Sequence, residues 1–226
     1  MSSAAAVIFD VDGVLLELTA AEEDAFFWAF EKLHRLTGLS RDWDSYRIRN
    51  DEDIINEILM THLGRSPTQA EHKAVIDTYL AHLTQGIGAR RLTPVQIDGA
   101  SQLLASLNGK AMLGVATANL IEAAGARLAA CGLWEPLKVH AFGANGGGAK
   151  LDILARALQR LALPPERVVF IGDNLNDVAA GLGNGVHFIG FSVDEDKCRR
   201  LAAAGAQRIC NHHRDTLKHI EDALQI

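Results

Sequence analysis

The chain has 226 residues, of which 48% are hydrophobic and 22% are charged, and its formal net charge is −6. This composition is that of an ordinary globular protein with enough apolar residues for a sizeable core. The acidic balance argues against a general binder of nucleic acid or of anionic membranes. The three cysteines are scattered and odd in number, which argues against a disulfide framework or a zinc cluster.

The first predicted element is a strand. Residues 4–9 form a continuous apolar run that ends in Asp10 and Asp12, and Gly13 follows. Such a run predicts a strand of a parallel sheet covered on both faces, with Asp10 at the carboxyl end, where open α/β sheets bind ligands. Two buried acids there are costly without a cation, although an ordinary Asp-Gly turn also fits these residues alone. The run is too short for a secretory signal or a membrane span, so we expect a cytoplasmic protein.

Residues 17–88 are predicted to contain helices and their connections and no strand. Apolar periodicity predicts helices over 20–36 and 51–62, and a third helix that Ser66 caps, with Pro67 at its first position, running to about residue 83. The aromatic side chains of the first helix are expected to pack between helices; they are Phe26, Phe27, Trp28 and Phe30. The segment is therefore an all-helical insert after the first strand.

From residue 93 onward, helices and strands alternate. The predicted helices cover 95–107, 119–130 (with Asn119 as cap), 150–161, 174–182, 195–204 and 215–224. The predicted strands cover 111–116, 137–142, 167–171, 186–189 and 207–210. This alternation predicts an α/β fold with a doubly wound parallel sheet.

Polar residues follow several of these strands. Thr117 and Asp173 end two strands, Asp177 lies one turn into the next helix, and Lys150 begins a helix after the glycine-rich loop 144–148. Because all carboxyl ends of a parallel sheet lie on one edge, these side chains should converge with the two N-terminal acids. Such a set suits phosphoryl transfer through an aspartyl phosphate, with Thr117 and Lys150 binding phosphoryl oxygens. The acids would hold Mg²⁺, which offsets the repulsion between carboxylate and phosphate.

Four motifs, in this order, resemble those of the haloacid dehalogenase superfamily. They are FDVDGVL (9–15), Thr117 after GVA, Lys150 before a helix, and FIGDNLND (170–177). The helical insert resembles the cap of the phosphoglycolate phosphatase and β-phosphoglucomutase branch, and GNGVHFIGF (183–191) and LAAAGAQRI (201–209) resemble the tail of that branch.

This resemblance implies a Rossmann-like catalytic core of residues 1–16 and 89–226 and a cap of residues 17–88. It implies Asp10 as nucleophile and Asp12 as general acid and then base. It also implies Mg²⁺ held by Asp10, the Asp12 carbonyl and Asp173, with Asp177 as a further acidic partner. The loop before Lys150 departs from the family, because it is unusually rich in glycine and Leu151 stands where proline is common.

The expected activity is Mg²⁺-dependent hydrolysis of a small phosphorylated metabolite, similar to phosphoglycolate or a sugar phosphate. A phosphomutase is the alternative, and a catalytically silent binding module is disfavoured by the intact acids and lysine. We expect a monomer or weak homodimer. The expected substrate-binding residues are Ala118 and Asn119 after Thr117, together with Arg47, Arg49 and Asn50 before the second cap helix. The two arginines alternatively pair on the surface with Asp51, Glu52 or Asp53.

Other motifs have ordinary explanations. The glycine-rich run before Lys150 is not a P-loop, because Leu151 stands where Ser or Thr must bind magnesium. His212 and His213 are expected in a solvated loop, and the cysteines are expected to be buried, inert thiols.

Overall fold

The computed structural model describes residues 4–226 and centres on a six-stranded parallel sheet of order β5-β4-β1-β6-β7-β8. The strands are β1 (Ala6–Phe9), β4 (Met112–Ala116), β5 (His140–Phe142), β6 (Val168–Gly172), β7 (His187–Phe191) and β8 (Ile209–Cys210). From β1 the chain first builds one side of the sheet and then the other. This is the doubly wound order, so the predicted fold class is confirmed.

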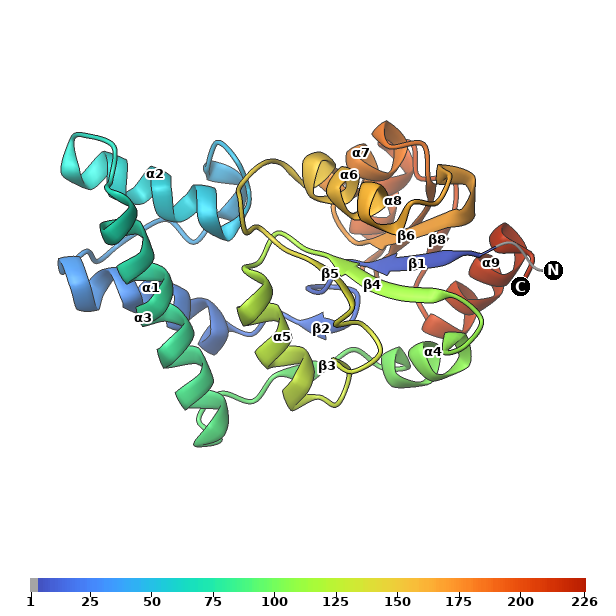
Figure 1. The fold of residues 1–226 in the computed structure, drawn as a ribbon, viewed down its shortest axis with the longest axis horizontal. Coiled ribbons are helices and arrows are strands. Elements are labelled where there is room, and N and C mark those ends of the chain that lie inside the picture. Colours follow the sequence, from blue (N-terminus) through green and yellow to red (C-terminus); the bar gives the residue numbers. More distant parts are fainter. Residues whose placement is uncertain (1–3) are drawn as a thin grey trace.

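β1 is the central strand, and both of its faces are covered. Ile8 is in register with Gly114 on β4 and with Phe170 on β6. Val7 and Phe9 pack in the cluster that holds α4 and α9, whereas Ala6 and Ile8 pack in the cluster on α6, α7 and α8. Helices thus lie above and below the sheet (Figure 1). Burial on both sides explains why the strand is an unbroken apolar run.

The helices agree closely with the predicted ones. They are α1 (Ala20–His34), α2 (Asp51–Leu63), α3 (Gln69–Gly88), α4 (Ala100–Leu107), α5 (Ile121–Ala130), α6 (Lys150–Leu161), α7 (Leu175–Gly183), α8 (Glu195–Ala203) and α9 (His213–Leu224), with short 3-10 turns at Trp43–Ser45 and Pro165–Arg167. None of the helices in residues 4–226 has the length and apolar character needed to span a membrane.

Helices α1, α2 and α3 form a layer of their own at the carboxyl ends of the strands (Figure 1). Their shared core includes Phe26, Phe27 and Phe30, all buried, which confirms the predicted packing role of these rings. Trp28 instead stacks on His82, with ring centroids 3.9 Å apart. The division into a core of residues 1–16 and 89–226 and a cap of residues 17–88 stays a prediction, and "cap" below means these three helices and their connections.

Several predicted elements begin elsewhere. The strand predicted over 137–142 is β5, which begins only at His140, and the strand predicted over 207–210 begins at Ile209. The predicted helix over 95–107 is wrong at its start, because Val95–Gln96 is strand β3, which pairs antiparallel with β2 (Leu16–Glu17). These strands join the two chain crossings between sheet and cap, a long-range pairing that local periodicity does not report. Helix α3 begins after Thr68 and not after Ser66, because Thr68 and Glu71 form a reciprocal capping box.

The predicted cap of α5 is also wrong. Leu120 precedes the helix without a side-chain cap, and Asn119 instead hydrogen-bonds to Thr117. The Ile121 N–H donates to Asn145 Oδ1 at 2.8 Å, so a residue from a distant loop takes over the capping.

His213 is buried, which corrects the expectation of a solvated loop. Its ring stacks on Phe191 with centroids 4.2 Å apart, and Nε2 lies 2.8 Å from the Val14 carbonyl oxygen. Burial lowers the pKa of His213. Among the cysteines only Cys210 is fully buried, whereas Cys131 and Cys198 are half-buried.

Close packing of β4 on β5 predicts the effect of one substitution. A Cβ at Gly114 would lie 2.2 Å from the His140 carbonyl oxygen, so Gly114→Ala must shift backbone. We expect the free energy of unfolding, measured by urea denaturation, to fall by about 1–3 kcal/mol. Gly88→Ala is the control, because this exposed helical glycine has open space around it and alanine should be neutral or stabilising there. Equal effects of the two changes would contradict the packing argument.

Candidate active site

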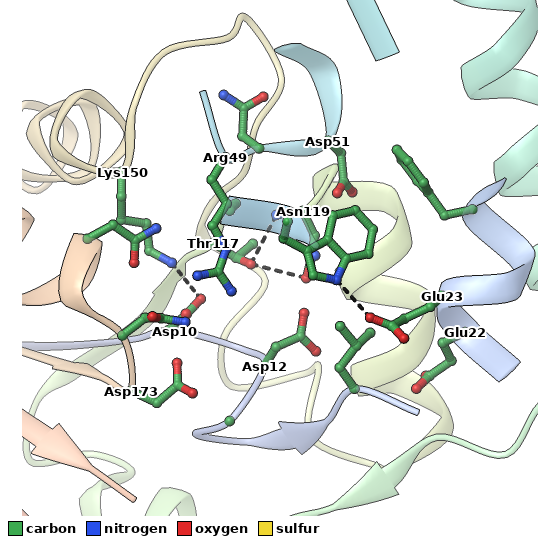
Figure 2. A pocket seen from close by; sticks show the side chains of 18 of the residues that line it. Asp10, Asp12, Glu22, Glu23, Arg49, Asp51, Thr117, Asn119, Lys150 and Asp173 are labelled. Atoms are coloured by element: carbon green, nitrogen blue, oxygen red, sulfur yellow. Dashed lines mark hydrogen bonds and ion pairs between the residues drawn. The ribbon is translucent and has the colours of Figure 1, made fainter. Parts of the chain in front are cut away.

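A cavity of about 290 Å³ lies between the carboxyl ends of the strands and the cap. The sheet side contributes strand-end residues, among them Asp10, Thr117 and Asp173. The cap side contributes Arg49 and Asp51, and Figure 2 shows these groups facing one space. The convergence expected from parallel strand ends therefore occurs.

Asp10 is fixed directly after β1. Its N–H donates to the Ile171 carbonyl oxygen at 2.8 Å, and its Oδ1 accepts a hydrogen bond from the Val11 N–H at 2.8 Å. The Lys150 ammonium lies 2.7 Å from the same oxygen. Within residues 4–226, Oδ2 makes no hydrogen bond, so one carboxylate oxygen stays available. Burial raises the pKa of Asp10 to about 7. The nearby Asp177 carboxylate adds to this rise, and the Lys150 ammonium opposes it.

Lys150 is the first residue of α6 and is almost completely buried. Its ammonium is shared by Asp10 and by Asp177, whose Oδ1 lies 3.0 Å away. Burial lowers the pKa of Lys150, but the two carboxylates outweigh it and leave the pKa above its ordinary value. Asp177 Oδ2 accepts the N–H groups of Asp173 and Asn174, both at 3.1 Å. Asp177 thus holds the lysine and the turn beneath the cavity.

Asp173 completes a cluster of acids. One carboxylate oxygen from each of Asp10, Asp173 and Asp177 lies within 4.8 Å of the other two, and all three residues are buried. Burial, together with the Asp10 carboxylate, raises the pKa of Asp173, while Lys197 of α8, which pairs with it, opposes the rise. Oxygen donors that concentrate negative charge fit a hard divalent cation.

Gly13 keeps this cluster tight. Its φ is +76°, and a Cβ there would lie 2.0 Å from Asp173 Oδ2. A side chain at this position would therefore displace the carboxylate that the acid cluster needs.

Thr117, Ala118 and Asn119 follow β4 and line the cavity. The Thr117 hydroxyl donates to Asn119 Oδ1 at 3.1 Å and accepts the Asn119 N–H at 3.2 Å. The hydroxyl is thereby oriented at the end of β4, on the lining of the cavity that Asp10 also lines.

Asp12 also lines the cavity, and its partner was not anticipated from the sequence. Arg127 of α5 donates from Nη2 to Asp12 Oδ1 at 2.6 Å and from Nε to Glu22 Oε1 of α1 at 2.7 Å. Arg127 and Glu22 are both buried. The available signal was an arginine within the alanine-rich segment 123–130, since a charged residue on an apolar helix is buried only when it is paired.

The cap residues expected to bind substrate take different positions. Arg49 lines the cavity and pairs with Asp44 at 2.9 Å, not with the acids that begin α2. Asn50 also lines the cavity, but its Nδ2 donates to the Gly148 carbonyl oxygen at 2.8 Å. Arg47 is exposed and does not line the cavity.

Asp51 is a cavity residue that the sequence did not single out. Its Oδ2 accepts the Leu120 N–H at 2.8 Å, and its own N–H donates to the Ala118 carbonyl oxygen at 2.9 Å. Burial raises the pKa of Asp51 to about 7, although the Leu120 N–H opposes the rise. The first residue of α2 is therefore bound directly to the segment after β4.

The glycine-rich loop before Lys150 receives the cap. Glu52 Oε2 accepts the N–H groups of Gly146 and of Gly147, the latter at 3.0 Å, and Asp53 Oδ2 accepts that of Gly148 at 3.0 Å. All three glycines have positive φ. Backbone N–H groups that converge in this way form an anion-binding nest, and here the anions are two cap carboxylates. We call these contacts the glycine-loop contact.

Residues 4–185 match the sequence model of the haloacid dehalogenase-like hydrolase family. Among curated relatives, the tyrosine-protein kinase PtkA of Mycobacterium tuberculosis is 36% identical over 92 residues, which is 39% of this chain and 32% of that protein. The alignment thus spans about a third of that relative. Protein CbbY of Cereibacter sphaeroides is 29% identical, with 90% of each chain covered. An N-acetylmuramic acid 6-phosphate phosphatase of Pseudomonas aeruginosa is 27% identical, with 97% of this chain and 96% of that protein covered.

Solved structures share the fold at low sequence identity. A hydrolase from Pseudomonas syringae has a TM-score of 0.70 at 20% identity, with 96% of this chain and 98% of that chain covered. A predicted phosphoglycolate phosphatase from Haemophilus somnus has a TM-score of 0.69 at 15% identity, with 96% and 97% covered.

The glycine-loop contact predicts a local change in hydrogen exchange. Glu52→Gln replaces a carboxylate by a weaker acceptor, so the amides of Gly146 and Gly147 should exchange roughly tenfold faster or more. Glu57→Gln is the matched control on the same helix, because Glu57 accepts only the Arg47 N–H within the cap in residues 4–226. Unchanged exchange at both glycines in Glu52→Gln would contradict the contact.

Proposed function

Since the chain belongs to the haloacid dehalogenase-like hydrolase family, we propose that it is a phosphatase that hydrolyses a small phosphorylated metabolite with Mg²⁺ as cofactor. The observation that carries the proposal is the arrangement at the strand ends, where Asp10, Asp173 and Lys150 meet in one buried cluster beside a cavity. The relative named for a phosphorylated sugar acid, aligned over nearly its whole length, supports a sugar-phosphate-like substrate over phosphoglycolate.

In the proposed reaction, Asp10 is the nucleophile. One carboxylate oxygen forms a bond to phosphorus while the bond from phosphorus to the leaving oxygen breaks, which gives an aspartyl phosphate. Asp12 donates a proton to the leaving oxygen, and it then takes a proton from the water that attacks phosphorus. That attack releases phosphate and restores the Asp10 carboxylate.

The remaining residues of the site bind the phosphoryl group and the metal and orient the Asp10 carboxylate. Lys150 and the Thr117 hydroxyl hold phosphoryl oxygens, and the ammonium also keeps Asp10 in place. The acids fit Mg²⁺, which when bound supplies charge neutralisation between carboxylate and phosphate. Asp10, Asp173 and the Asp12 carbonyl are the proposed ligands, with Asp177 acting behind them through Lys150.

The cap supplies contacts to the rest of the substrate. We assign this role to Arg49, with Ala118 and Asn119 on the core side, because all three line the cavity. Asn50 acts mainly by holding α2 to the loop at Gly148. Arg47, which is exposed, is the least suited of the residues first considered.

A screen of phosphorylated metabolites with Mg²⁺ tests the function directly. Free phosphate should be released from at least one sugar phosphate, and Asp10→Asn should lower this rate by several orders of magnitude while the protein stays folded. Transfer of the phosphoryl group within the sugar, without net release, would favour the phosphomutase alternative. Normal turnover by Asp10→Asn would remove Asp10 from the mechanism.

The proposed role of Asp12 predicts a dependence on the leaving group. General acid catalysis typically contributes ~10²–10⁴-fold, and an acidic leaving group needs little of it. Asp12→Asn should therefore lower kcat/KM for alkyl phosphates much more than for an aryl phosphate. Equal losses on the two classes would contradict proton donation by Asp12.

The proposed cofactor predicts that hydrolysis depends on a divalent metal. Chelation should abolish hydrolysis and added Mg²⁺ should restore it. Asp173→Ala should raise the Mg²⁺ concentration that gives half-maximal activity, measured by titration of the chelated protein. Full activity in excess chelator would refute the proposed cofactor.

A further inference from the structure

We propose that Arg127 is a positioning residue that holds the Asp12 carboxylate and couples it to the cap through Glu22. The inference rests on the proposed function, because it concerns the group assigned as general acid and base. It assigns a role to an arginine that lies outside the four motifs and comes from a core helix.

The guanidinium of Arg127 divides its donors between core and cap. Nη2 donates to Asp12 Oδ1 at 2.6 Å and to the Glu17 carbonyl oxygen at 3.1 Å. Nε donates to Glu22 Oε1 at 2.7 Å. The guanidinium is planar and its N–H directions are fixed. Its bonds to Asp12 and to Glu22 therefore fix the position of one carboxylate relative to the other.

The two ion pairs of Arg127 differ in how far their carboxylates are exposed to solvent. The side chains of Arg127 and Glu22 are 3% and 2% exposed, whereas that of Asp12 is 22% exposed and faces the cavity. Glu22 alone would satisfy the charge of a buried structural arginine. The second ion pair instead binds Asp12, the group that donates a proton to the leaving oxygen in the proposed reaction. A positioning role requires such a contact.

Glu22 is itself immobilised at the start of the cap. Its Oε2 accepts the Thr19 N–H at 2.9 Å and the Thr19 hydroxyl at 2.8 Å, in the capping box that begins α1. Glu17, the last residue of β2, precedes this turn. Arg127 thus binds the segment where the chain passes from core to cap, and the position of α1 and the position of the Asp12 carboxylate depend on one side chain.

This arrangement links cap closure to proton transfer. Movement of α1 away from α5 separates Glu22 from Arg127 and leaves the guanidinium free to shift from Asp12. A closed cap that excludes water therefore also completes the placement of the acid. A purely structural Arg127 would stabilise the cap equally for every substrate.

The test combines leaving groups with a double-mutant cycle. Arg127→Lys keeps the charge but loses the fork, so kcat/KM should fall more for alkyl than for aryl phosphates, by part of the ~10²–10⁴-fold that acid catalysis contributes. In an Asp12→Asn background the same change should have little further effect. Arg208→Lys is the control, because Arg208 bonds a carbonyl oxygen of α9 and does not line the cavity.

Glu22→Gln tests the same link without altering the arginine. It should give a smaller loss with the same preference for alkyl phosphates, and it serves as the test if Arg127→Lys does not fold. Equal losses on both substrate classes, or full additivity with Asp12→Asn, would overturn the positioning role. If Asp12→Asn itself shows no dependence on the leaving group, the role proposed for Asp12 fails first and the inference fails with it.

Discussion

The ion pair between Lys150 and two carboxylates is the interaction on which the rest of the site depends. A buried ammonium is stable only when it is paired, and here Asp10 and Asp177 share it from the ends of β1 and the first turn of α7. The Asp10 carboxylate in turn needs the cation, because burial raises its pKa and favours its neutral form. One side chain of α6 therefore joins the end of β1 to the start of α7 and keeps the Asp10 carboxylate ionisable.

Charge also fixes the cap above this cluster, through carboxylates of the cap that accept hydrogen bonds from the core. On one side a core cation, Arg127, receives the cap carboxylate of Glu22. On the other side backbone N–H groups of the loop 146–148 receive the cap carboxylates of Glu52 and Asp53. At both points the cap presents acids and the core presents donors, as it also does where the Leu120 N–H donates to Asp51 of α2.

The parts of the fold that the sequence predicts are those with local causes. Unbroken apolar runs identify the buried strands, and strand order then brings Asp10, Thr117 and Asp173 to one edge without further information. The pairing of β2 with β3, the burial of His213 and the Arg127–Glu22 pair depend instead on residues about 80 to 200 positions apart. Neither periodicity nor capping preference reports such contacts, and for that reason the cap partners of the site were missed while its strand ends were not.

The departure from the family pattern at residues 149–151 has a physical explanation. Helix α6 begins at Lys150 because Asp152 Oδ2 accepts the Ala149 N–H at 2.8 Å, so a proline after the lysine is not needed to set the helix start. Leu151 at that position packs instead toward Gly183 of α7, where a Cβ would meet its Cδ1 at 2.6 Å. The preceding glycines supply the positive φ values that turn their N–H groups toward the cap. Loop composition therefore serves cap docking, while the helix start keeps Lys150 against Asp10.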